Sequence, residues 1–395
     1  MKMTRNSRMQ SLILATTISI GLCFTSPVFA QQDVRDVGTF ILDLNGKGLI
    51  SLGTLGGSVT KVYDINDVGQ VVGISTTATG ERHAFITGPN GAGMTDLGTL
   101  GGPYSIATSI NNAGQVVGEA YLDVPGRTHA FITGPNGVGM TDLGPQGEFW
   151  SSATGINNAG QVAGNRNPYD PYDFRDHPFI TGPNGVGMTD LGPLGRVSAD
   201  ATGINDAGQV VGTSDTAAGD QHAFITGPNG VGMTDLGTLG GVNSFAAGIN
   251  DAGQVVGAST TATGGMHAFI TGPNGVGMTD LGPLEANKSY ANSINDAGEV
   301  VGAFATATSG MHAFITGPNG VGMTDLNSLV ELPAGTFISQ AIGINNAGQV
   351  LIVTSTLVPE PETYALMLAG LGLIGFVAWR QKSENRIFTI LFPEN

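Results

Sequence analysis

One block of about 45 residues recurs along most of this 395-residue chain. Each copy carries, with small variations, the phrases Ile-Asn-(Asn/Asp)-Ala-Gly-Gln-Val-Val-Gly and His-Ala-Phe-Ile-Thr-Gly-Pro-Asn-Gly-Val-Gly-Met-Thr-Asp-Leu-Gly. A fixed period of this length is typical of solenoids, propellers and arrays, because one unit cannot bury its own apolar face and must stack on a neighbour. The repeat therefore limits the architectures that this chain can adopt.

The two phrases are distributed so that the two ends of the array complement each other. The first phrase occurs seven times, starting at Ile65, Ile110, Ile156, Ile204, Ile249, Ile294 and Ile344. The second phrase is headed by the six histidines of the chain, His83, His129, His177, His222, His267 and His312. A degenerate copy of the second phrase, without the histidine, spans residues 39–57. The array thus begins with the second half of a unit and ends, near Thr356, with the first half.

Within one copy, four short runs of β-type composition alternate with turn residues. In one full copy these runs are residues 105–110, 115–120, 129–133 and 140–144. Asn-Asn-Ala-Gly between the first two runs suits a type I turn followed by a left-handed glycine, and Gly-Pro-Asn-Gly between the last two favours a second hairpin. No helical period of about ten residues without glycine occurs in the repeats. We therefore expect an all-β array of four-stranded antiparallel meanders.

Seven front halves and seven back halves are what a closed ring requires when its last blade is built from both ends of the array. This count predicts a seven-bladed β-propeller over residues 39–357. The alternative is an open β-solenoid or array, whose terminal strands would leave edges exposed to edge-to-edge association. Capping repeats that would cover such edges are not visible in the sequence.

The charge balance argues against one class of partner. The chain has a formal net charge of -16, whereas nucleic-acid binding requires clustered Lys and Arg side chains. We therefore expect no nucleic-acid partner, and we expect the acidity to serve solubility.

The first 30 residues have the three parts of a secretory signal peptide. Three basic residues precede an apolar run over residues 12–24, and Ala30 ends a small-residue cleavage site. Residues 31–38 are expected to form a linker to the repeats. The single cysteine, Cys23, lies inside the signal, so we expect neither disulfides nor thiol chemistry in the exported chain.

The C-terminal part has the pattern of a second targeting segment, in addition to the signal peptide. The triplet Pro359-Glu360-Pro361 precedes an apolar run over residues 364–379, which is expected to form a transmembrane helix. A helix of that length spans about 24 Å, somewhat less than the ~30 Å core of a bilayer. The residues expected to anchor it at the membrane interface are Trp379, Arg380 and Lys382. A tail over residues 383–395 follows.

This arrangement, over residues 358–382, resembles the PEP-CTERM sorting signal of Gram-negative bacteria: a Pro-Glu-Pro motif, a short hydrophobic helix and basic residues. The resemblance implies that the protein is held at the inner membrane until an exosortase, a transpeptidase-like membrane enzyme, cuts near the motif. It further implies transfer to the cell surface or extracellular matrix, in bacteria that make exopolysaccharide. Family members usually end soon after the basic residues, whereas this chain continues through its tail.

The repeats in turn resemble the extracellular HAF-repeat family, named for the triplet at His83-Ala84-Phe85 and its later copies. The resemblance covers residues 39–356. It implies export and a β-rich array, and the family carries no established activity that could be transferred to this chain.

Histidine is the first candidate for chemistry, because imidazole binds metals and transfers protons. The six histidines occupy the same point of successive repeats, so a ring would spread them around its axis. We therefore expect a structural role, in which the ring nitrogens tie neighbouring loops or strands. The alternative is a metal-binding ring of histidines near the axis.

Other candidate motifs are weaker. The recurrent Asn-Asp pairs offer oxygen ligands for Ca2+, but turn chemistry explains them better, because they lack the donor spacing of an EF-hand loop. The Gly-Pro-Asn-Gly-Val-Gly stretch is not a dinucleotide fingerprint, and neither a serine-hydrolase elbow nor a zinc-protease motif is present. We therefore predict no cofactor other than Ca2+ at these pairs, and no enzyme class is indicated.

The largest break in the repeat symmetry lies between Gln146 and His177, where one loop is about three residues longer than its counterparts. Aromatic rings that stack on sugar faces, beside carboxylates and guanidinium groups that bind hydroxyls, are what saccharide binding uses. The predicted ligand-binding residues are Trp150, Tyr169, Tyr172, Asp173 and Arg175. A drifted repeat with a solvated loop is the alternative explanation.

These observations favour a non-catalytic surface or matrix scaffold that an exosortase sorts and that contacts the membrane and exopolysaccharide. The alternative is an extracellular polysaccharide-active hydrolase or lyase, since two acids in the longer loop would be the minimum for glycoside hydrolysis.

Overall fold

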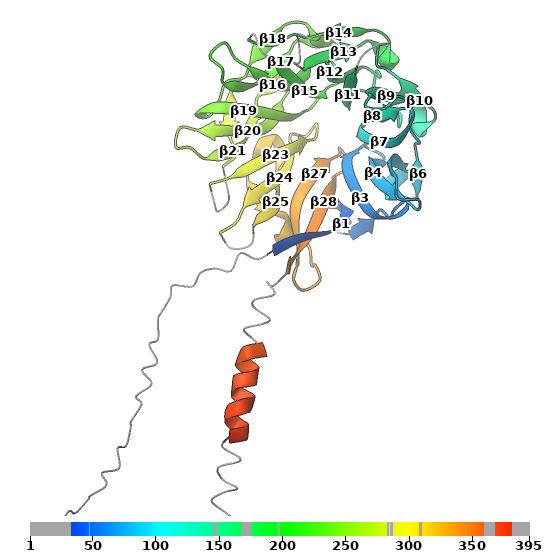
Figure 1. Ribbon diagram of the computed structural model, residues 1–395. Helices are drawn as coiled ribbons and strands as arrows, with labels where there is room; N and C mark the ends of the chain where they lie inside the picture. Colours follow the sequence, from blue (N-terminus) through cyan, green and yellow to red (C-terminus); the bar gives the residue numbers. More distant parts are fainter. Residues whose placement is uncertain are drawn as a thin grey trace, which may run out of the picture. The chain divides into compact units, whose positions relative to one another are not determined.

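The computed structural model describes residues 33–46, 48–145, 149–167, 176–195, 198–282, 284, 287–307, 310–358 and 368–380. The chain divides into two compact units, one formed by residues 33–358 and the other by the two terminal segments. The first unit is all-β, as predicted, and its strands form antiparallel groups of four (Figure 1). The predicted signal peptide, residues 1–30, lies outside the described residues.

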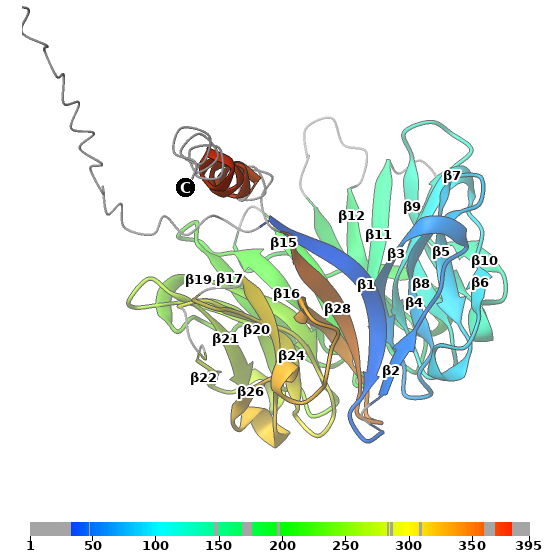
Figure 2. The ribbon, with the colours of Figure 1, turned by 90° about the horizontal axis from the view of Figure 1, so that it is seen from below.

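One group of four is built from both ends of the first unit. In this group β1 (Asp33–Asp43) pairs with β2 (Gly48–Ser51) and with β28 (Gln349–Val358), which also pairs with β27 (Thr336–Ile344). Figure 2 shows β1 beside β28. The structure differs from the predicted linker over residues 31–38, because the pairing with β28 starts at Asp33. The half-repeats at the two ends of the array thus form one shared sheet.

The other groups follow one another along the chain, with their strands in sequence order. They are β3 (Gly56–Ile65), β4 (Val71–Thr77), β5 (Arg82–Thr87) and β6 (Met94–Asp96); β7 (Gly101–Ile110), β8 (Val116–Leu122), β9 (Thr128–Thr133) and β10 (Met140–Asp142); β11 (Trp150–Ile156), β12 (Val162–Asn167), β13 (His177–Thr181) and β14 (Met188–Asp190); β15 (Ala199–Ile204), β16 (Val210–Asp215), β17 (Gln221–Thr226) and β18 (Met233–Asp235); β19 (Gly240–Ile249), β20 (Val255–Thr261), β21 (Met266–Thr271) and β22 (Met278–Asp280); β23 (Ser289–Ile294), β24 (Val300–Ala305), β25 (Met311–Thr316) and β26 (Met323–Asp325).

Short 3-10 helices connect the third and fourth strands of these groups. They are η1 (Pro89–Gly91), η2 (Pro135–Gly137), η3 (Pro183–Gly185), η4 (Pro228–Gly230), η5 (Pro273–Gly275) and η6 (Pro318–Gly320), and a further one, η7 (Leu326–Ser328), follows β26.

The groups close into a ring. The first strand of each group contacts the first strand of the next, and β27 contacts β3 to complete the circle (Figure 1). Four-stranded antiparallel sheets placed radially around a central channel are the β-propeller architecture. The open array expected as the alternative would have left β3 and β27 apart.

The apolar core lies between neighbouring sheets. One cluster, for example, joins Val72 and Ile86 of one group to Ile110, Val116 and Phe131 of the next. The phenylalanines of the repeated His-Ala-Phe phrase are fully buried in these clusters, as Phe131 is. Each sheet therefore covers its neighbour, and no single repeat would be stable alone.

The turn chemistry explains why the two repeated phrases form hairpins. In the first phrase Gly69 has φ +75° and its N–H donates to the carbonyl of Asn66 at 2.9 Å, which is the expected left-handed glycine turn. In the second phrase Asn90, as well as Gly91, adopts a positive φ. The N–H of Gly91 donates to the carbonyl of Gly69 at 2.9 Å, so the two turns of one repeat are joined.

The glycine of the Val-Val-Gly phrase has a packing reason. A Cβ atom placed on Gly212 would lie 1.9 Å from the carbonyl oxygen of Asp200 on the neighbouring strand, and 2.9 Å from the ring of Phe224. Only glycine allows the second strand to lie this close to the bulge that the pairing register shows in the first strand.

The helix of the second unit covers residues 368–380. At about 1.5 Å per residue it is about 20 Å long, well short of a bilayer core. Within the described part of the chain, no helix has the length and apolar character needed to cross a membrane. The prediction of a transmembrane helix over residues 364–379 gains no support from this finding, and residues 364–367 lie outside the described residues.

Candidate functional site

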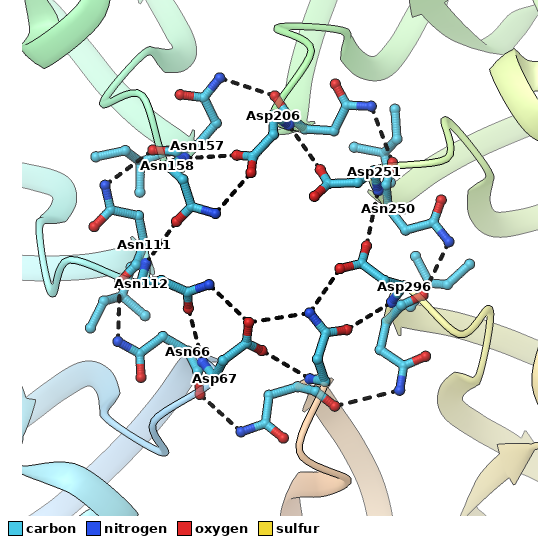
Figure 3. A pocket seen from close by; sticks show the side chains of 18 of the residues that line it. Asn66, Asp67, Asn111, Asn112, Asn157, Asn158, Asp206, Asn250, Asp251 and Asp296 are labelled. Carbon is cyan, nitrogen blue, oxygen red and sulfur yellow. Dashed lines mark hydrogen bonds between the residues drawn. The ribbon is translucent and has the colours of Figure 1, made fainter.

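The repeated Ile-Asn phrases meet at one end of the central channel, where a cavity of about 220 Å³ is lined by them (Figure 3). In each phrase the side-chain amide of the asparagine donates to the main-chain carbonyl of the same asparagine in the next group, at 2.9 to 3.4 Å. The asparagines are Asn66, Asn111, Asn157, Asn205, Asn250, Asn295 and Asn345, and all are buried. They form a continuous circle of hydrogen bonds, which we call the asparagine ring.

The residue after each of these asparagines forms a second circle, the Asx ring. Each main-chain N–H donates to the side-chain oxygen of the next member at 2.8 to 3.1 Å. Its members are Asp67, Asn112, Asn158, Asp206, Asp251, Asp296 and Asn346. Since the side-chain oxygens accept from neighbouring groups, the Asn-Asx pairs join the sheets as well as turning the chain.

The Asx ring is not uniform in charge. Asn112 and Asn346 donate to Asp67, so that carboxylate has amide neighbours on both sides. Asp251 lies between two other aspartates, Asp206 and Asp296. Burial raises the pKa of Asp251; a hydrogen bond from the N–H of Asp206 lowers it, and the nearby carboxylates raise it further.

The side-chain oxygens of the Asx ring are distributed around a circle (Figure 3). Among the described residues, no three His, Cys, Asp or Glu side chains are grouped so that they could hold one metal ion. The Ca2+ prediction for the Asn-Asp pairs and the alternative of a histidine metal ring gain no support here, and both stay predictions.

The histidines lie away from the asparagine ring, on the third strands. Nδ1 of five of them contacts the aspartate thirteen residues later at 2.8 to 2.9 Å; these are His83, His129, His222, His267 and His312. Burial lowers the pKa of His267, but its hydrogen bonds with Asp280 and Asn287 outweigh this effect and the pKa is raised overall.

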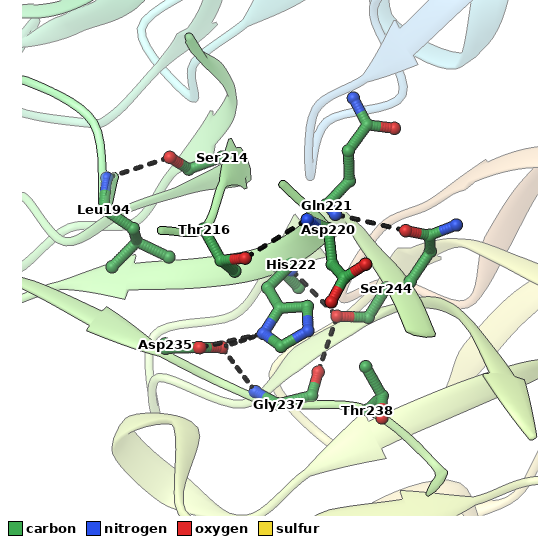
Figure 4. A network of polar contacts seen from close by, with 12 residues as sticks. Leu194, Ser214, Thr216, Asp220, Gln221, His222, Asp235, Gly237, Thr238 and Ser244 are labelled. Carbon is green, nitrogen blue, oxygen red and sulfur yellow. Dashed lines mark hydrogen bonds and ion pairs between the residues drawn. The ribbon is translucent and has the colours of Figure 1, made fainter. Parts of the chain in front are cut away.

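Figure 4 shows the network of polar contacts around His222 and Asp235. Asp235 contacts His222 and accepts from the N–H of Gly237 at 2.7 Å, which holds the turn after β18. Ser244, at the start of the next group, donates to the carbonyl of Gly237 at 2.6 Å and accepts from the N–H of Ala223 at 2.9 Å. The His222–Asp235 contact joins two strands of one sheet, and Ser244 ties that sheet to the next. The structural role of the repeat histidines stays a prediction.

The third repeat departs from this pattern. There Arg166 of β12 binds Asp190 through Nε and Nη2, both at 2.8 Å. The hydrogen bonds from Arg166 lower the pKa of Asp190. The symmetry break predicted between Gln146 and His177 thus includes an arginine partner for the repeat aspartate.

Aromatic residues gather near this break. The rings of Tyr104 on β7 and Tyr121 on β8 lie 5.0 Å apart between centroids. Tyr63 on β3 is 39% exposed and Tyr121 is 42% exposed. Burial raises the pKa of Tyr63 and of Tyr104, and the charge of Glu119 raises both further, so this carboxylate lies within electrostatic reach of both phenols.

Glu119 on β8 links the tyrosines to the third repeat. Burial raises the pKa of its carboxyl group, and hydrogen bonds from Ser152 and Trp150 of β11 lower it in part. Trp150 is half-buried. The indole N–H is a donor only, so it donates to the carboxylate. We call Tyr63, Tyr104, Tyr121, Trp150 and Glu119 the aromatic cluster.

Two cavities adjoin the aromatic cluster. One, of about 110 Å³, is lined by Tyr63, Tyr104, Lys61 and Arg82 among others. The other, of about 620 Å³, lies between the closing sheet and β3, and it shares Lys61 and Tyr63 with the first. Tyr104 precedes Ile110 by six residues, about 20 Å along an extended strand, so it lies far along β7 from the asparagine ring.

Of the residues predicted to bind ligand, only Trp150 is within the described residues; Tyr169, Tyr172, Asp173 and Arg175 lie outside them. Sequence reasoning missed Tyr63, Tyr104, Tyr121 and Glu119. A signal was present, because Tyr104 and Trp150 occupy the same repeat position, six residues before the isoleucine of the first phrase.

The predicted PEP-CTERM sorting signal is confirmed by comparison with a protein family. Residues 357–383 match the PEP-CTERM protein-sorting motif. The motif implies an exported protein that an exosortase sorts. Trp379, 66% exposed, and Arg380 lie in the helix over residues 368–380, whereas Pro359, Glu360, Pro361 and Lys382 lie outside the described residues. Among curated proteins, none matches the sequence.

Solved structures with a similar chain path have low sequence identity. A prolyl endopeptidase is 9% identical, with a TM-score of 0.52 over 77% of this chain and 50% of that one. The β-propeller domain of the Trilobed protease from Pyrococcus furiosus is 12% identical, with a TM-score of 0.49 over 72% and 87%. TolB from Acinetobacter baumannii is 11% identical, with a TM-score of 0.46 over 73% and 64%. This chain thus spans half of the endopeptidase and less than two thirds of that TolB chain, and the likeness to the endopeptidase concerns the fold alone.

Proposed function

We propose that this protein is a non-catalytic scaffold of the cell surface or extracellular matrix, built on a seven-bladed β-propeller and sorted by an exosortase. The observation that carries the proposal is the position of the sorting motif. It matches residues 357–383, and the last strand of the ring, β28, ends at Val358. All strands of the propeller therefore precede the Pro359-Glu360-Pro361 triplet.

This position makes sorting compatible with an intact fold. In the proposed architecture each group of four strands is one blade, and β27, β28, β1 and β2 form the seventh. A cut near the triplet would separate the C-terminal segment without removing either partner of the β1–β28 pairing, which extends from Asp33 to Val358. The ring would stay closed after processing.

The use of the repeated polar residues supports a scaffold. The asparagine ring and the Asx ring use side chains that recur in every copy, and their bonds run between neighbouring groups. The histidine contacts recur in nearly every copy and join the third and fourth strands of one group. These contacts give the side chains a structural reason to recur, so their repetition needs no catalytic explanation. The resemblance of the repeats to the extracellular HAF family agrees with this role.

One observation favours a second candidate, an extracellular polysaccharide hydrolase or lyase. A carboxyl group with a raised pKa is what a general acid requires, and Glu119 has this property beside Trp150. Incubation with polysaccharides followed by a reducing-end assay separates the two. The scaffold releases no sugar, whereas release that Glu119→Gln abolishes would establish the enzyme.

Export and sorting are tested in the native host with and without its exosortase. The proposal predicts that the protein is found at the surface or in the medium of the complete host and is retained in the membrane fraction of the host lacking the enzyme. Equal surface exposure in both hosts would contradict exosortase sorting.

A further inference from the structure

We infer that the aromatic cluster is a binding site for a neutral polysaccharide chain, with Tyr104 and Trp150 as its stacking platforms. This inference deepens the proposed scaffold role, since it names the class of molecule that the scaffold holds. It goes beyond the sequence prediction, which placed saccharide binding at Trp150 and at Tyr169, Tyr172, Asp173 and Arg175 of the longer loop.

The cluster breaks the repeat symmetry in three consecutive repeats. At the position of Tyr104 and Trp150 the other copies carry Val59, Ser198, Asn243, Lys288 and Ile338. At the position of Tyr121 they carry Thr76, Asn167, Asp215, Thr260, Ala305 and Ser355. The sheets pack in the same way in all these copies, so the ring does not need aromatic residues there. Their presence in neighbouring groups requires another reason.

The exposure of the rings points to a ligand with an apolar face. Tyr63 and Tyr121 expose 39% and 42% of their surface, while the phenylalanines of the repeat core are fully buried. Amphipathic rings that are partly exposed beside polar groups suit a partner that is itself amphipathic. A pyranose offers C–H groups on one face and hydroxyl groups around its edge.

The polar groups around the rings suit those hydroxyls. Hydrogen bonds from Trp150 and Ser152 fix the Glu119 carboxylate, and they use only part of its acceptor capacity. The cation-bearing residues that line the two adjoining cavities are Lys61 and Arg82. The hydroxyl side chains that line the larger cavity are Thr39, Ser51, Thr54, Ser58 and Thr60. The site thus offers both donors and acceptors.

The dimensions favour a chain of sugars over a single one. The cavities of about 110 and 620 Å³ meet at Val59, Lys61 and Tyr63, so they form one continuous surface. Trp150 lines neither cavity, but Glu119 connects it to Tyr104 of the smaller cavity, because this carboxylate accepts from Trp150 and lies within electrostatic reach of Tyr104. A ligand that touched Tyr63 and Trp150 together would bridge β3, β7 and β11.

Charge favours a neutral chain. Glu119 lies at the centre of the cluster, and the whole protein carries a net charge of -16. A polyuronate would approach against that field, and Lys61 and Arg82 would compensate only locally. A neutral glycan meets no such barrier.

The test uses the purified full-length protein, titrated by calorimetry with cellohexaose, laminarihexaose, xylohexaose and maltohexaose, and with an alginate hexasaccharide as the anionic probe. Fluorescence gives a second readout, because the chain has two tryptophans. A Trp379→Phe background leaves Trp150 as the single emitter. We expect at least one neutral hexasaccharide to bind and to shift this emission.

The variants are Tyr104→Ala and Tyr121→Ala, with Tyr290→Ala as the matched control. Tyr290 is a 36% exposed tyrosine on β23 and lies outside the aromatic cluster. Each cluster variant should weaken binding about tenfold or more, with an unchanged urea midpoint, and the control should bind as the unmodified protein does. If Tyr104→Ala fails to fold, the affinity of Tyr121→Ala and the shift in Trp150 emission still test whether the aromatic cluster binds the probe.

Three results would overturn the inference: no binding of any neutral probe, binding that neither cluster variant weakens, or a preference for alginate. A protein that binds none of the probes but is still sorted to the surface would refute the polysaccharide site and leave the scaffold role standing. A protein that binds a neutral probe but stays in the membrane fraction would support the polysaccharide site and contradict the proposed sorting.

Discussion

Replacement of Asn345 by alanine tests whether the two ends of the array close the asparagine ring. Asn345 is 3% exposed, and its Nδ2 donates to the carbonyl of Asn66 at 2.9 Å, across 279 residues of sequence. Nδ2 also donates to Oε1 of Gln349, and Oδ1 accepts from the N–H of Gln349, both at 2.8 Å. Alanine leaves the N–H and Oε1 of the buried Gln349 without these partners, and the carbonyl of Asn66 keeps only the bond from the N–H of Gly69.

The expected loss follows from the N–H and Oε1 of Gln349, the two buried groups that lose a partner. An unsatisfied buried donor or acceptor costs roughly 1 to 3 kcal/mol, so Asn345→Ala should lower the free energy of unfolding by about 2 to 6 kcal/mol. This is a large part of the ~5 to 15 kcal/mol that stabilises a typical domain. The assay is urea unfolding of the purified protein, followed by circular dichroism.

Two further variants make the assay specific for closure. Asn250→Ala removes the equivalent bonds inside the array, to the carbonyl of Asn295 and to Gln254. Val276→Ala changes a side chain that is 73% exposed and should cost less than about 0.5 kcal/mol. A closed ring predicts similar losses for Asn345→Ala and Asn250→Ala. A loss below about 1 kcal/mol for Asn345→Ala alone would refute the closure.

Three other substitutions test the packing and the charges. Gly212→Ala should destabilise the protein by about 2 to 4 kcal/mol in the same assay, because its Cβ would meet a main-chain oxygen at 1.9 Å. Gly48→Ala is the control and should be close to neutral, because no atom lies within 4 Å of its Cβ. Equal losses of stability for the two variants would exclude the packing argument. The raised pKa of His267 stabilises the fold fully below its unfolded value of about 6.5, and this contribution is lost as the pH rises through the folded pKa. His267→Gln should therefore cost more stability at pH 5.5 than at pH 9, and a pH-independent loss would contradict the contact with Asp280. Because the pKa of Asp251 is raised, its ionisation opposes folding above its unfolded pKa of about 3.8, so Asp251→Asn should be more stable than the unmodified protein at pH 7 but not at pH 3. A gain that persists at pH 3 would point to another cause.

Much of the fold could be predicted from the sequence because each repeat carries its own turn chemistry. The glycine at position 69 and the Pro-Asn-Gly at 89–91 are local signals, and both form turns as such residues do. The sharing of one sheet by β1 and β28 followed from counting half-repeats. These predictions needed no knowledge of contacts between repeats.

The parts that could not be predicted depend on contacts between repeats. The Asn-Asx pairs were interpreted as turn residues, and nothing local shows that Asn66 donates to the carbonyl of Asn111, 45 residues away. Glu119 and Trp150 belong to different sheets and meet only when the ring is assembled. The sequence predicted a C-terminal helix from its apolar run, and the structure describes a helix over residues 368–380, while residues 364–367 of the predicted run lie outside the described residues.

The most direct test of the central claim is the intact mass and cell fraction of the protein isolated from its native host, compared with a variant in which Pro359, Glu360 and Pro361 are changed to alanines. The account predicts a shortened protein at the surface or in the medium for the unmodified sequence, and a longer, membrane-retained protein for the variant. Identical masses and identical fractions for the two proteins would contradict exosortase sorting at this motif.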